Sequence, residues 1–186
     1  TVILAAEQTL FEDFENGGFE AWRMTGNAFE ASASSTQGGN QPGEVTGFAG
    51  ESFASSFTQG SKGMGSLTSS IFTIQKSYIS FLIGGGNLKG LTSIQLLVDQ
   101  KIVREAIGQS DCNMLPKTWD VSALIGKRAA LRLVDASTRP HGYILIDHIL
   151  FSSKPEPSFP PATRNGLPLI PGLAATSLIP GLQIPK

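Results

Sequence analysis

The sequence predicts an all-β fold, an antiparallel β-sandwich with an extended, proline-rich C-terminal arm. The first observation is that apolar and polar residues alternate over short runs, which is typical of strands with one buried face. The second is that each run ends at turn residues, such as the glycines at 84–86, the Asp99-Gln100 pair and Gly108. The third is that no run of comparable length shows the apolar spacing of a helix. A parallel sheet would require such helices between its strands.

The stretch from 71 to 108 is predicted to supply the central strands. Its alternating apolar positions are Ile79, Phe81 and Ile83, then Ile94, Leu96 and Val98, and more weakly Ile102, Val103 and Ala106. Each of the first two sets places its members on one face of a strand. The rest of the chain is expected to pack around these strands.

The chain before this stretch contains shorter runs. Residues 1–8 form an N-terminal segment whose start, TVILAA, is either the remnant of a signal sequence or a first strand. Strands are predicted at 9–15, 22–25 and 28–33, the last two around the turn pair Gly26-Asn27. Residues 34–50 are rich in Gly, Ser and Gln and predict a loop. Strands are predicted again at 52–57, 65–69 and 71–74.

After the central stretch, a loop is predicted at 109–118. A single helical turn follows within WDVSALIGK (119–127), which Asp120 can cap and Gly126 can end. The last two strands are predicted at 130–135 and 143–151. From Lys154 onward the chain holds eight of its eleven prolines, and the alternation stops. The sandwich domain is therefore predicted to span 9–153, and residues 154–186 to form the arm.

The composition argues against several classes of function. Charged residues make up 16% of the 186-residue chain and the net charge is −1, so no basic field for nucleic acid is evident. The single cysteine, Cys112, excludes an intramolecular disulfide, and no apolar stretch is long enough to span a bilayer. The sequence contains neither a G-x-S-x-G elbow nor an H-E-x-x-H motif. We therefore expect no enzymatic activity.

Short blocks in a fixed order resemble those of a known family. They are DFE (13–15), Trp22 with Gly26, Ala28 and Phe29, LTS (67–69), YISFLIGGG (78–86), LVD (97–99), VR (103–104), WDVS (119–122), VD (134–135) and DHI (147–149). Over residues 9–153 the chain resembles the fructan-binding module at the C-terminus of bacterial levanases. The resemblance implies a jelly-roll sandwich of the galactose-binding-like type that binds a sugar without performing chemistry.

A sugar site must combine a flat apolar face with polar groups that make paired hydrogen bonds. The candidates are Arg104, Asp135, His141 and Tyr143, with Trp22 as a stacking platform. Trp22 is alternatively a core residue. Arg104 alternatively pairs with Glu105 or with an acid on a neighbouring strand.

The resemblance also implies a structural calcium ion that ties the first strand to the last. Asp13 or Glu15, together with Asp147, would supply hard oxygen ligands, and backbone carbonyls would complete the shell. Alternatively, these acids are solvated or paired with arginines, of which Arg104, Arg128 and Arg132 are the candidates. No other cofactor is expected.

The arm differs from ordinary linkers, which carry charge and few apolar residues. LIPGL occurs at 169–173 and again at 178–182, and no charge lies between Arg164 and Lys186. The large apolar residues of the arm are Leu167, Leu169, Ile170, Leu173, Leu178, Ile179, Leu182 and Ile184. Burying each of them is worth roughly 1.5–3 kcal/mol. The arm is therefore expected to lie either over its own sandwich or across a partner protein.

Two functions remain open. The main prediction, favoured by the arm, is a non-catalytic, extracytoplasmic (periplasmic or secreted) interaction subunit of a larger assembly, such as a photosynthetic or respiratory membrane complex. The alternative, favoured by the resemblance, is a carbohydrate-binding module for β-fructan or a related glycan. Titration with fructans and truncation of the arm separate the two.

Overall fold

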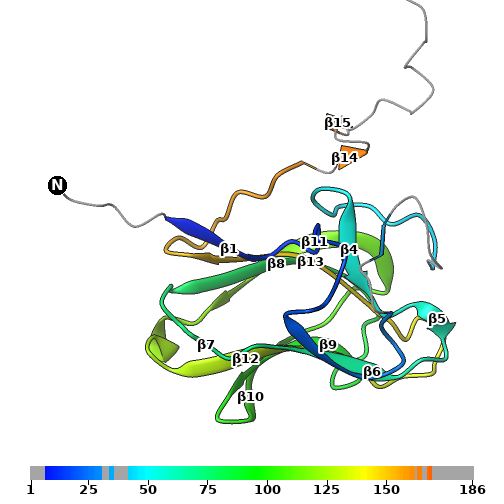
Figure 1. Ribbon diagram of the computed structural model, residues 1–186, viewed down its shortest axis with the longest axis horizontal. Coiled ribbons are helices and arrows are strands. Elements are labelled where there is room, and N and C mark those ends of the chain that lie inside the picture. Colours follow the sequence, from blue (N-terminus) through cyan, green and yellow to red (C-terminus); the bar gives the residue numbers. More distant parts are fainter. Residues whose placement is uncertain (1–6, 31–33, 36–41, 162, 165–166, 169–186) are drawn as a thin grey trace, which may run out of the picture.

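Two antiparallel sheets pack face to face in the computed structural model of the protein (Figure 1). The structure describes residues 7–30, 34–35, 42–161, 163–164 and 167–168. Sheet one has the strand order β11-β8-β13-β4-β3, with β1 also paired to β13. Sheet two has the order β10-β9-β12-β6-β2, with β7 also paired to β12. This arrangement confirms the predicted antiparallel β-sandwich.

The elements are mostly short strands separated by turns. In chain order they are β1 (Gln8–Glu12), β2 (Trp22–Gly26), β3 (Ser34–Ser35), β4 (Ser52–Ser55), β5 (Thr58–Ser61), β6 (Gly65–Ser69), β7 (Phe72–Thr73), β8 (Tyr78–Gly85), β9 (Thr92–Val98), β10 (Lys101–Ala106), β11 (Asp111–Asp120), the 3-10 helix η1 (Ser122–Leu124), β12 (Arg128–Asp135), β13 (Ile144–Ser152), β14 (Thr163–Arg164) and β15 (Leu167–Pro168). The described part of the chain contains no apolar helix of the length that a bilayer requires.

The predicted central stretch contributes strands to both sheets. Strand β8 lies in the middle of sheet one, and β9 and β10 lie in sheet two. The core between the sheets includes the predicted positions Ile79, Phe81 and Ile83 of β8 and Ile94, Leu96 and Val98 of β9. The alternation in this stretch therefore identified the inner faces of both sheets correctly.

Sheet one is buried on both faces, not on one as predicted. A second apolar cluster covers its outer face and includes Leu82 of β8 and Leu145 of β13. Phe48 and Phe159 pack there from segments outside the sheet. The backbone N–H of Thr46 also donates to Cys112 O at 3.3 Å, which holds the 42–50 segment against β11. Sheet two keeps the one-sided pattern, since buried and half-buried residues alternate along β12.

The loop predicted at 109–118 is wrong. Most of it belongs to β11, an edge strand that pairs with β8 only among the described strands. Pro116, opposite Leu82, is tolerated there because an edge strand needs hydrogen bonds on one side only. The loop predicted at 34–50 likewise contains the two-residue strand β3, and its residues 36–41 lie outside the described part.

The strand predicted at 28–33 is also wrong where the structure describes it. Residues 28–30 form no strand, and residues 31–33 lie outside the described part. Gly26 has a φ of +72°, and the backbone N–H of Asn27 donates to Met64 O at 2.9 Å. The chain therefore turns away from β2 at this pair.

The predicted helical turn is confirmed as η1. The carboxylate of Asp120 accepts hydrogen bonds from the backbone N–H of Ser122 at 2.9 Å and from its hydroxyl at 2.6 Å. These bonds lower the pKa of Asp120. Gly126, with a φ of +84°, follows the turn. Gly126 therefore ends the turn as predicted, whereas the predicted cap is wrong: the N-cap position is Val121, no side chain caps it, and Asp120 bonds to Ser122 from the residue before.

Candidate functional site

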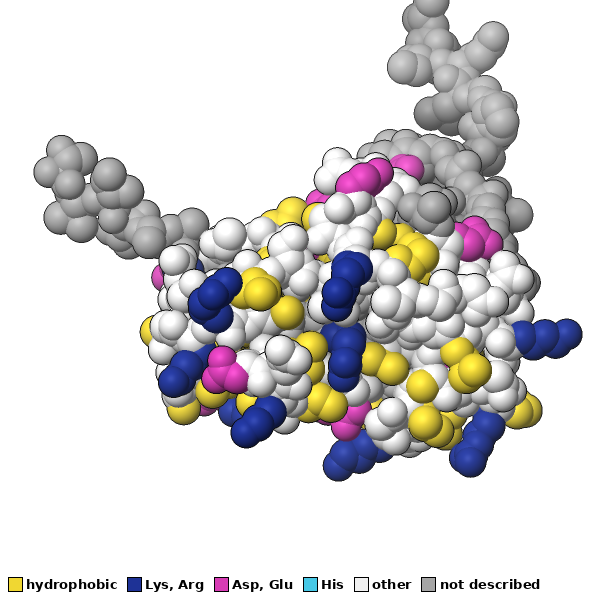
Figure 2. Space-filling model, turned by 60° about the horizontal axis from the view of Figure 1, so that its bottom comes forward, with side chains coloured by type: hydrophobic (Ala, Val, Ile, Leu, Met, Phe, Trp, Pro, Cys, Tyr) yellow, Lys and Arg dark blue, Asp and Glu magenta, His cyan; other side chains and the backbone are white. Residues whose placement is uncertain are grey.

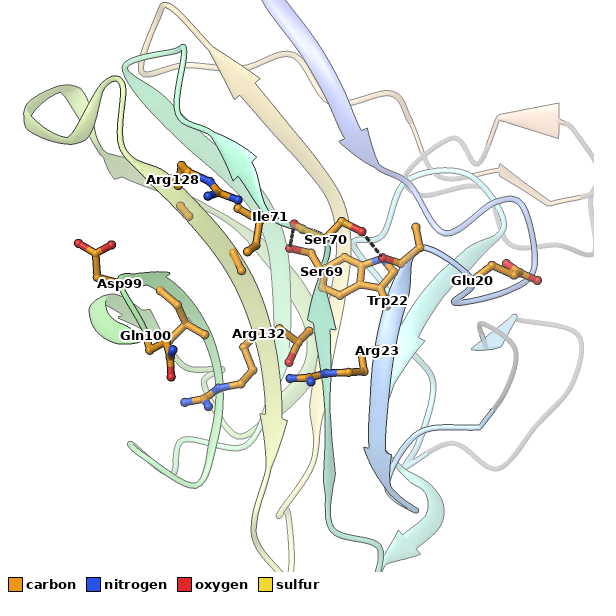
Figure 3. A pocket seen from close by; sticks show the side chains of 15 residues that line it. Glu20, Trp22, Arg23, Ser69, Ser70, Ile71, Asp99, Gln100, Arg128 and Arg132 are labelled. Atoms are coloured by element: carbon orange, nitrogen blue, oxygen red, sulfur yellow. Dashed lines mark hydrogen bonds between the residues drawn. The ribbon is translucent and has the colours of Figure 1, made fainter.

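A groove runs along the outer face of sheet two. Alternation along β12 points Arg128, Ala130 and Arg132 outward, while Leu131 and Leu133 enter the core. The small Ala130 lies between longer side chains, which leaves a hollow of about 840 Å³ (Figure 3). Its lining includes Glu20, Trp22, Arg23, Thr68, Ser70, Ile71, Leu97, Asp99, Gln100, Arg128, Ala130 and Arg132.

A second hollow continues the groove along the same strands. It measures about 600 Å³ and shares Arg132 with the first. Thr25, Ser66, Gln95, Glu105 and Val134 are among the residues that line it. We call the two hollows together the sheet-two groove. Figure 2 shows this side of the molecule, with basic side chains spread along it and apolar side chains between them.

A row of five polar residues crosses the groove at one level of the sheet. Arg23 on β2 lies opposite Thr68 on β6, and Thr68 lies opposite Arg132 on β12. The row continues from Arg132 to Gln95 on β9 and to Glu105 on β10. Residues directly opposite in a sheet share a face, and we call these five residues the polar row.

Hydrogen bonds fix one half of the polar row. Arg132 donates to Gln95 Oε1 from Nε at 3.0 Å and from Nη2 at 2.6 Å. Gln95 Nε2 donates to Glu105 Oε1 at 3.2 Å, and the backbone N–H of Gly90 donates to the same oxygen at 3.1 Å. The Arg132 guanidinium is therefore oriented before any ligand arrives, with Nη1 not bonded to any described residue.

The other basic groups of the groove differ from Arg132. Arg23 and Arg128 are exposed, and neither hydrogen-bonds through its side chain to a residue that the structure describes. Figure 3 shows Arg23 and Arg132 on either side of the strand between them, with Glu20 and Asp99 out at the two sides of the groove. The middle of the groove thus carries positive charge.

The apolar part of the groove is aliphatic. Ile71 and Ile102 are 63% and 50% exposed, and each lines one of the two hollows. Trp22 also lines the groove, but it is only 7% exposed, and its Nε1 donates to Glu12 Oε2 at 2.8 Å. The indole therefore belongs to the core, which was the predicted alternative to a stacking platform.

The other predicted sugar-binding residues do not gather at one site. Arg104 donates to the backbone O of Asp120 from Nε at 3.2 Å and from Nη2 at 2.9 Å, so the alternative of a pair with Glu105 is not observed. Asp135 lies at the second hollow of the groove, but it is 1% exposed and accepts a hydrogen bond from Ser56 Oγ at 2.7 Å. Burial raises the pKa of Asp135 to about 6, against the effect of its hydrogen bonds.

Tyr143 and His141 lie apart from the groove. Tyr143 is 2% exposed and packs on the outer face of sheet one, where its hydroxyl shares a 3.3 Å hydrogen bond with Cys112 Sγ. Burial raises the pKa of Tyr143. His141 is exposed in the loop before β13 and has a φ of +60°. Neither residue lines the groove.

The acids proposed as calcium ligands lie near one another. Asp147 is fully buried in β13; its Oδ2 accepts a hydrogen bond from the backbone N–H of Ala49 at 2.7 Å, whereas Oδ1 has no partner. Burial, and secondarily the charges of Glu15 and Asp13, raise the pKa of Asp147 to about 8. Glu15 Oε1 accepts from the backbone N–H groups of Glu51 and Ser52.

The cluster is incomplete as a metal centre. No three acid, imidazole or thiol side chains of the described residues stand together in metal-binding geometry. The unpartnered Oδ1 of Asp147 is nevertheless an atom that a cation would satisfy, because a buried charged oxygen without a partner is costly. Asp147 also precedes a bulge in β13, which displaces the strand at this point.

Sequence reasoning missed the groove, although its signal was present. Along 128–135, Arg128, Ala130 and Arg132 alternate with Ala129, Leu131 and Leu133. That pattern places both arginines on one exposed face. From sequence, both arginines were expected only as partners for acids. Arg23 and Gln95 join this exposed face through the register between neighbouring strands, which the sequence does not show.

Comparisons with known proteins agree with the fold. No protein-family model matches the sequence. A protein of Aspergillus rugulosus, named as a candidate glycosyl hydrolase, ecdE, is 37% identical over 148 residues, which is 77% of this chain and 21% of that protein. The chain therefore spans about a fifth of the length of this relative.

Solved structures with similar folds are adhesin domains and carbohydrate-binding modules. The K3 adhesin domain of Lys-gingipain from Porphyromonas gingivalis is 13% identical with a TM-score of 0.50, over 78% of this chain and 100% of that domain. A family 35 carbohydrate-binding module from Clostridium thermocellum is 12% identical with a TM-score of 0.40, over 79% and 99%. The likeness to the adhesin domain agrees with the β-sandwich fold, and the levanase-type family stays a prediction.

Proposed function

We propose that this domain is a non-catalytic carbohydrate-binding module that holds a glycan chain in the sheet-two groove. The observation that carries the proposal is the polar row, in which the Arg132 guanidinium is oriented by Gln95 on an open sheet face. An open groove admits the interior of a polymer, whereas a closed pocket admits only its end. β-Fructan is the ligand that the resemblance implies.

The groove supplies the contacts that a sugar chain needs. The guanidinium groups and the Thr68 hydroxyl of the polar row can exchange hydrogen bonds with sugar hydroxyls, whereas the Gln95 amide is 3% exposed and serves to orient Arg132. Ile71 and Ile102 offer aliphatic surface to the C–H faces of the rings. Because Arg132 and Gln95 are already oriented, binding loses less side-chain entropy than it would with mobile groups.

The relative named as a candidate glycosyl hydrolase supports a role beside a polysaccharide-degrading enzyme. A module tethered to an enzyme raises the local concentration of polymer at the active site. We propose that this chain supplies binding and not hydrolysis, outside the cytoplasm. Hydrolysis would need two carboxyl groups about 5–10 Å apart around one glycosidic bond. Two acids line the second hollow, but Glu105 is held by Gln95 and Gly90, and Asp135 is 1% exposed and held by Ser56.

We also propose that Asp147, with Asp13 or Glu15, holds a structural calcium ion. The support is the unpartnered, buried Oδ1 of Asp147 and the effect of the two neighbouring charges on its pKa. Calcium accepts carboxylate and backbone carbonyl oxygens in flexible geometry. The ion would neutralise the cluster and fix β1 to β13, and it would take no part in sugar binding.

Isothermal titration calorimetry with levan, inulin and a panel of other plant and bacterial polysaccharides tests the proposed function. At least one glycan should bind, and Arg132→Ala should weaken it by about tenfold or more through loss of a charge-assisted contact. Arg139→Ala, which changes the same charge in an exposed loop outside the groove, should bind normally. Absence of heat with the whole panel, or equal loss in both variants, would refute glycan binding in the groove.

The alternative of a protein-anchored subunit rests on the arm. Leu169, Ile170, Leu173, Leu178, Ile179, Leu182 and Ile184 lie outside the described residues, and of Leu167 only the backbone is described. The groove and the named relative support the glycan-binding alternative and give no support to a membrane assembly. Attachment through the arm stays a prediction of the sequence.

A further inference from the structure

We propose that the glycan held by the sheet-two groove carries carboxylate groups, which Arg23 and Arg132 bind from the two sides of Thr68. This inference rests on the proposed function, because it names the class of glycan that the same groove binds. The proposed ligand differs from the one that the family resemblance implies, which is a neutral fructan.

The register of sheet two places the two arginines as a pair. Thr68 pairs with Arg23 on one side and with Arg132 on the other, so all three side chains leave the sheet at the same level. Adjacent strands lie about 4.8 Å apart, so the two arginine backbones are separated by about 10 Å. The two guanidinium groups do not converge, because that of Arg132 is turned to Gln95 on β9 (Figure 3), so each arginine offers its own donors, one on either side of Thr68.

No described acid neutralises this pair. Glu105, the acid of the polar row, lies two strands beyond Arg132 and is bonded to Gln95 and Gly90. The ion pair found among the described residues, Lys154 with Glu7, is elsewhere in the molecule. Two like charges on the same face of a sheet repel each other when nothing compensates them, and a bound anion would compensate these.

The groove lacks the feature that neutral sugars use most. Stacking on a neutral sugar requires an exposed aromatic face, yet the exposed large apolar residues among those described are Leu10, Met64, Ile71, Ile102, Leu115 and Ile125, none of them aromatic. Trp22 is buried and bonded to Glu12. Affinity in this groove must therefore come mainly from its polar and charged groups.

A carboxylate fits the donors better than a phosphate polymer does. The planar fork of arginine matches the two oxygens of a carboxylate. The chain as a whole has a net charge of −1, which does not suit a polyphosphate such as nucleic acid. A uronic acid unit supplies the carboxylate together with ring hydroxyls for Thr68 and the remaining donors of the row.

The test compares polygalacturonate with highly methyl-esterified pectin, in which the same backbone carries neutral esters, in calorimetric titrations of the full chain at physiological salt. Levan, inulin and dextran sulfate complete the set. We expect polygalacturonate to bind about tenfold or more tightly than the esterified polymer and the two fructans. Dextran sulfate should bind more weakly than polygalacturonate.

Variants locate the effect. Arg23→Gln and Arg132→Gln should each remove most of the preference for the acidic polymer, whereas Arg139→Gln, with the same loss of charge outside the groove, should keep it. Since Arg23 bonds to no described residue, Arg23→Gln should retain the wild-type melting temperature, which separates loss of binding from loss of folding.

Each outcome decides the proposal. Equal binding of the esterified polymer, or tighter binding of levan, would overturn the carboxylate inference and leave the proposed function intact. Equal binding of dextran sulfate, or equal loss in Arg139→Gln, would show general charge attraction and also overturn it. Binding of no polysaccharide at all would overturn both the inference and the proposed function.

Discussion

The carboxylate of Asp147 has two oxygens in unequal surroundings, one bonded to Ala49 and one with no partner. Its pKa rises from 3.8 to about 8 in the folded protein. Between pH about 4 and about 8, the folded state therefore keeps a proton that the unfolded state has lost, and folding becomes less favourable as pH rises through this window. Below it both states are protonated, and the penalty is absent.

Asp147→Asn should consequently flatten the pH dependence of stability. The asparagine can still accept the Ala49 hydrogen bond, and it removes the buried charge. Thermal melts at pH 5 and pH 8 should show a smaller decrease in melting temperature for this variant than for the wild type. Asp111→Asn, an exposed acid of β11, is the matched control and should behave like the wild type. A wild-type melting temperature that rises from pH 5 to pH 8 would contradict the assignment.

Calcium should reverse the penalty if it binds this cluster. At pH 8, adding calcium should raise the wild-type melting temperature in a concentration-dependent way, because a ligand that binds only the folded state stabilises it. Asp147→Asn should lose most of this response, and a chelator should abolish it in the wild type. If millimolar calcium gave no shift in the melting temperature, the metal proposal would be refuted. The proposal of glycan binding in the groove would be unaffected.

At the scale of elements, the β9–β10 hairpin carries backbone strain. Asp99 and Gln100 form its turn with φ values of +49° and +62°, a conformation that suits glycine. Gln100→Gly should raise the free energy of unfolding by about 0.5–1 kcal/mol, because the relief of backbone strain exceeds the opposing effect of the chain entropy that glycine adds to the unfolded state. Chemical denaturation of both proteins measures the difference.

Gln75→Gly provides the matched control for the hairpin. Gln75 is exposed and is not among the positive-φ residues, so glycine there removes no strain and should slightly lower the stability. An equal effect of both substitutions would show that the turn is not strained.

At the scale of the whole molecule, residues that follow the predicted boundary at 153 make specific contacts with the sandwich. The backbone N–H of Ser158 donates to Gln8 Oε1 at 3.0 Å, and the Gln8 amide donates back to Ser158 O at 2.9 Å. Phe159 packs against the outer cluster of sheet one and contacts His148 at a ring-centroid distance of 6.0 Å. These contacts join the segment after β13 to the start of β1.

Two truncations separate the sandwich from its arm. A chain that ends at Pro161 should keep the wild-type melting temperature and glycan affinity, whereas one that ends at Lys154 should melt several degrees lower because it loses the apolar contacts of Phe159. If the arm anchors a partner, that partner should co-purify with the full chain and with neither truncation. Loss of glycan binding in the longer truncation would contradict a groove confined to sheet two.

The sequence by itself determined the local pattern of this protein. Alternation at 79–83 and 94–98 identified the inner faces of two strands, and Asp120 with Gly126 identified the helical turn, because these signals lie within a few neighbouring residues. The grouping of Asp147 with Glu15 and Asp13 was available only through a family resemblance. The β11 strand was missed because it is an edge strand. Its polar residues and Pro116 give it the composition of a loop.

Only the tertiary structure decided which faces are covered and which residues meet. The sequence of β8 does not reveal that Phe48 and Phe159 bury its outer side, and no local pattern pairs Arg23 with Thr68 and Arg132 across three strands. Register and coverage depend on contacts between residues far apart in the chain. The groove depends on both: local alternation determines the face on which each side chain lies, and strand order determines which side chains become its neighbours.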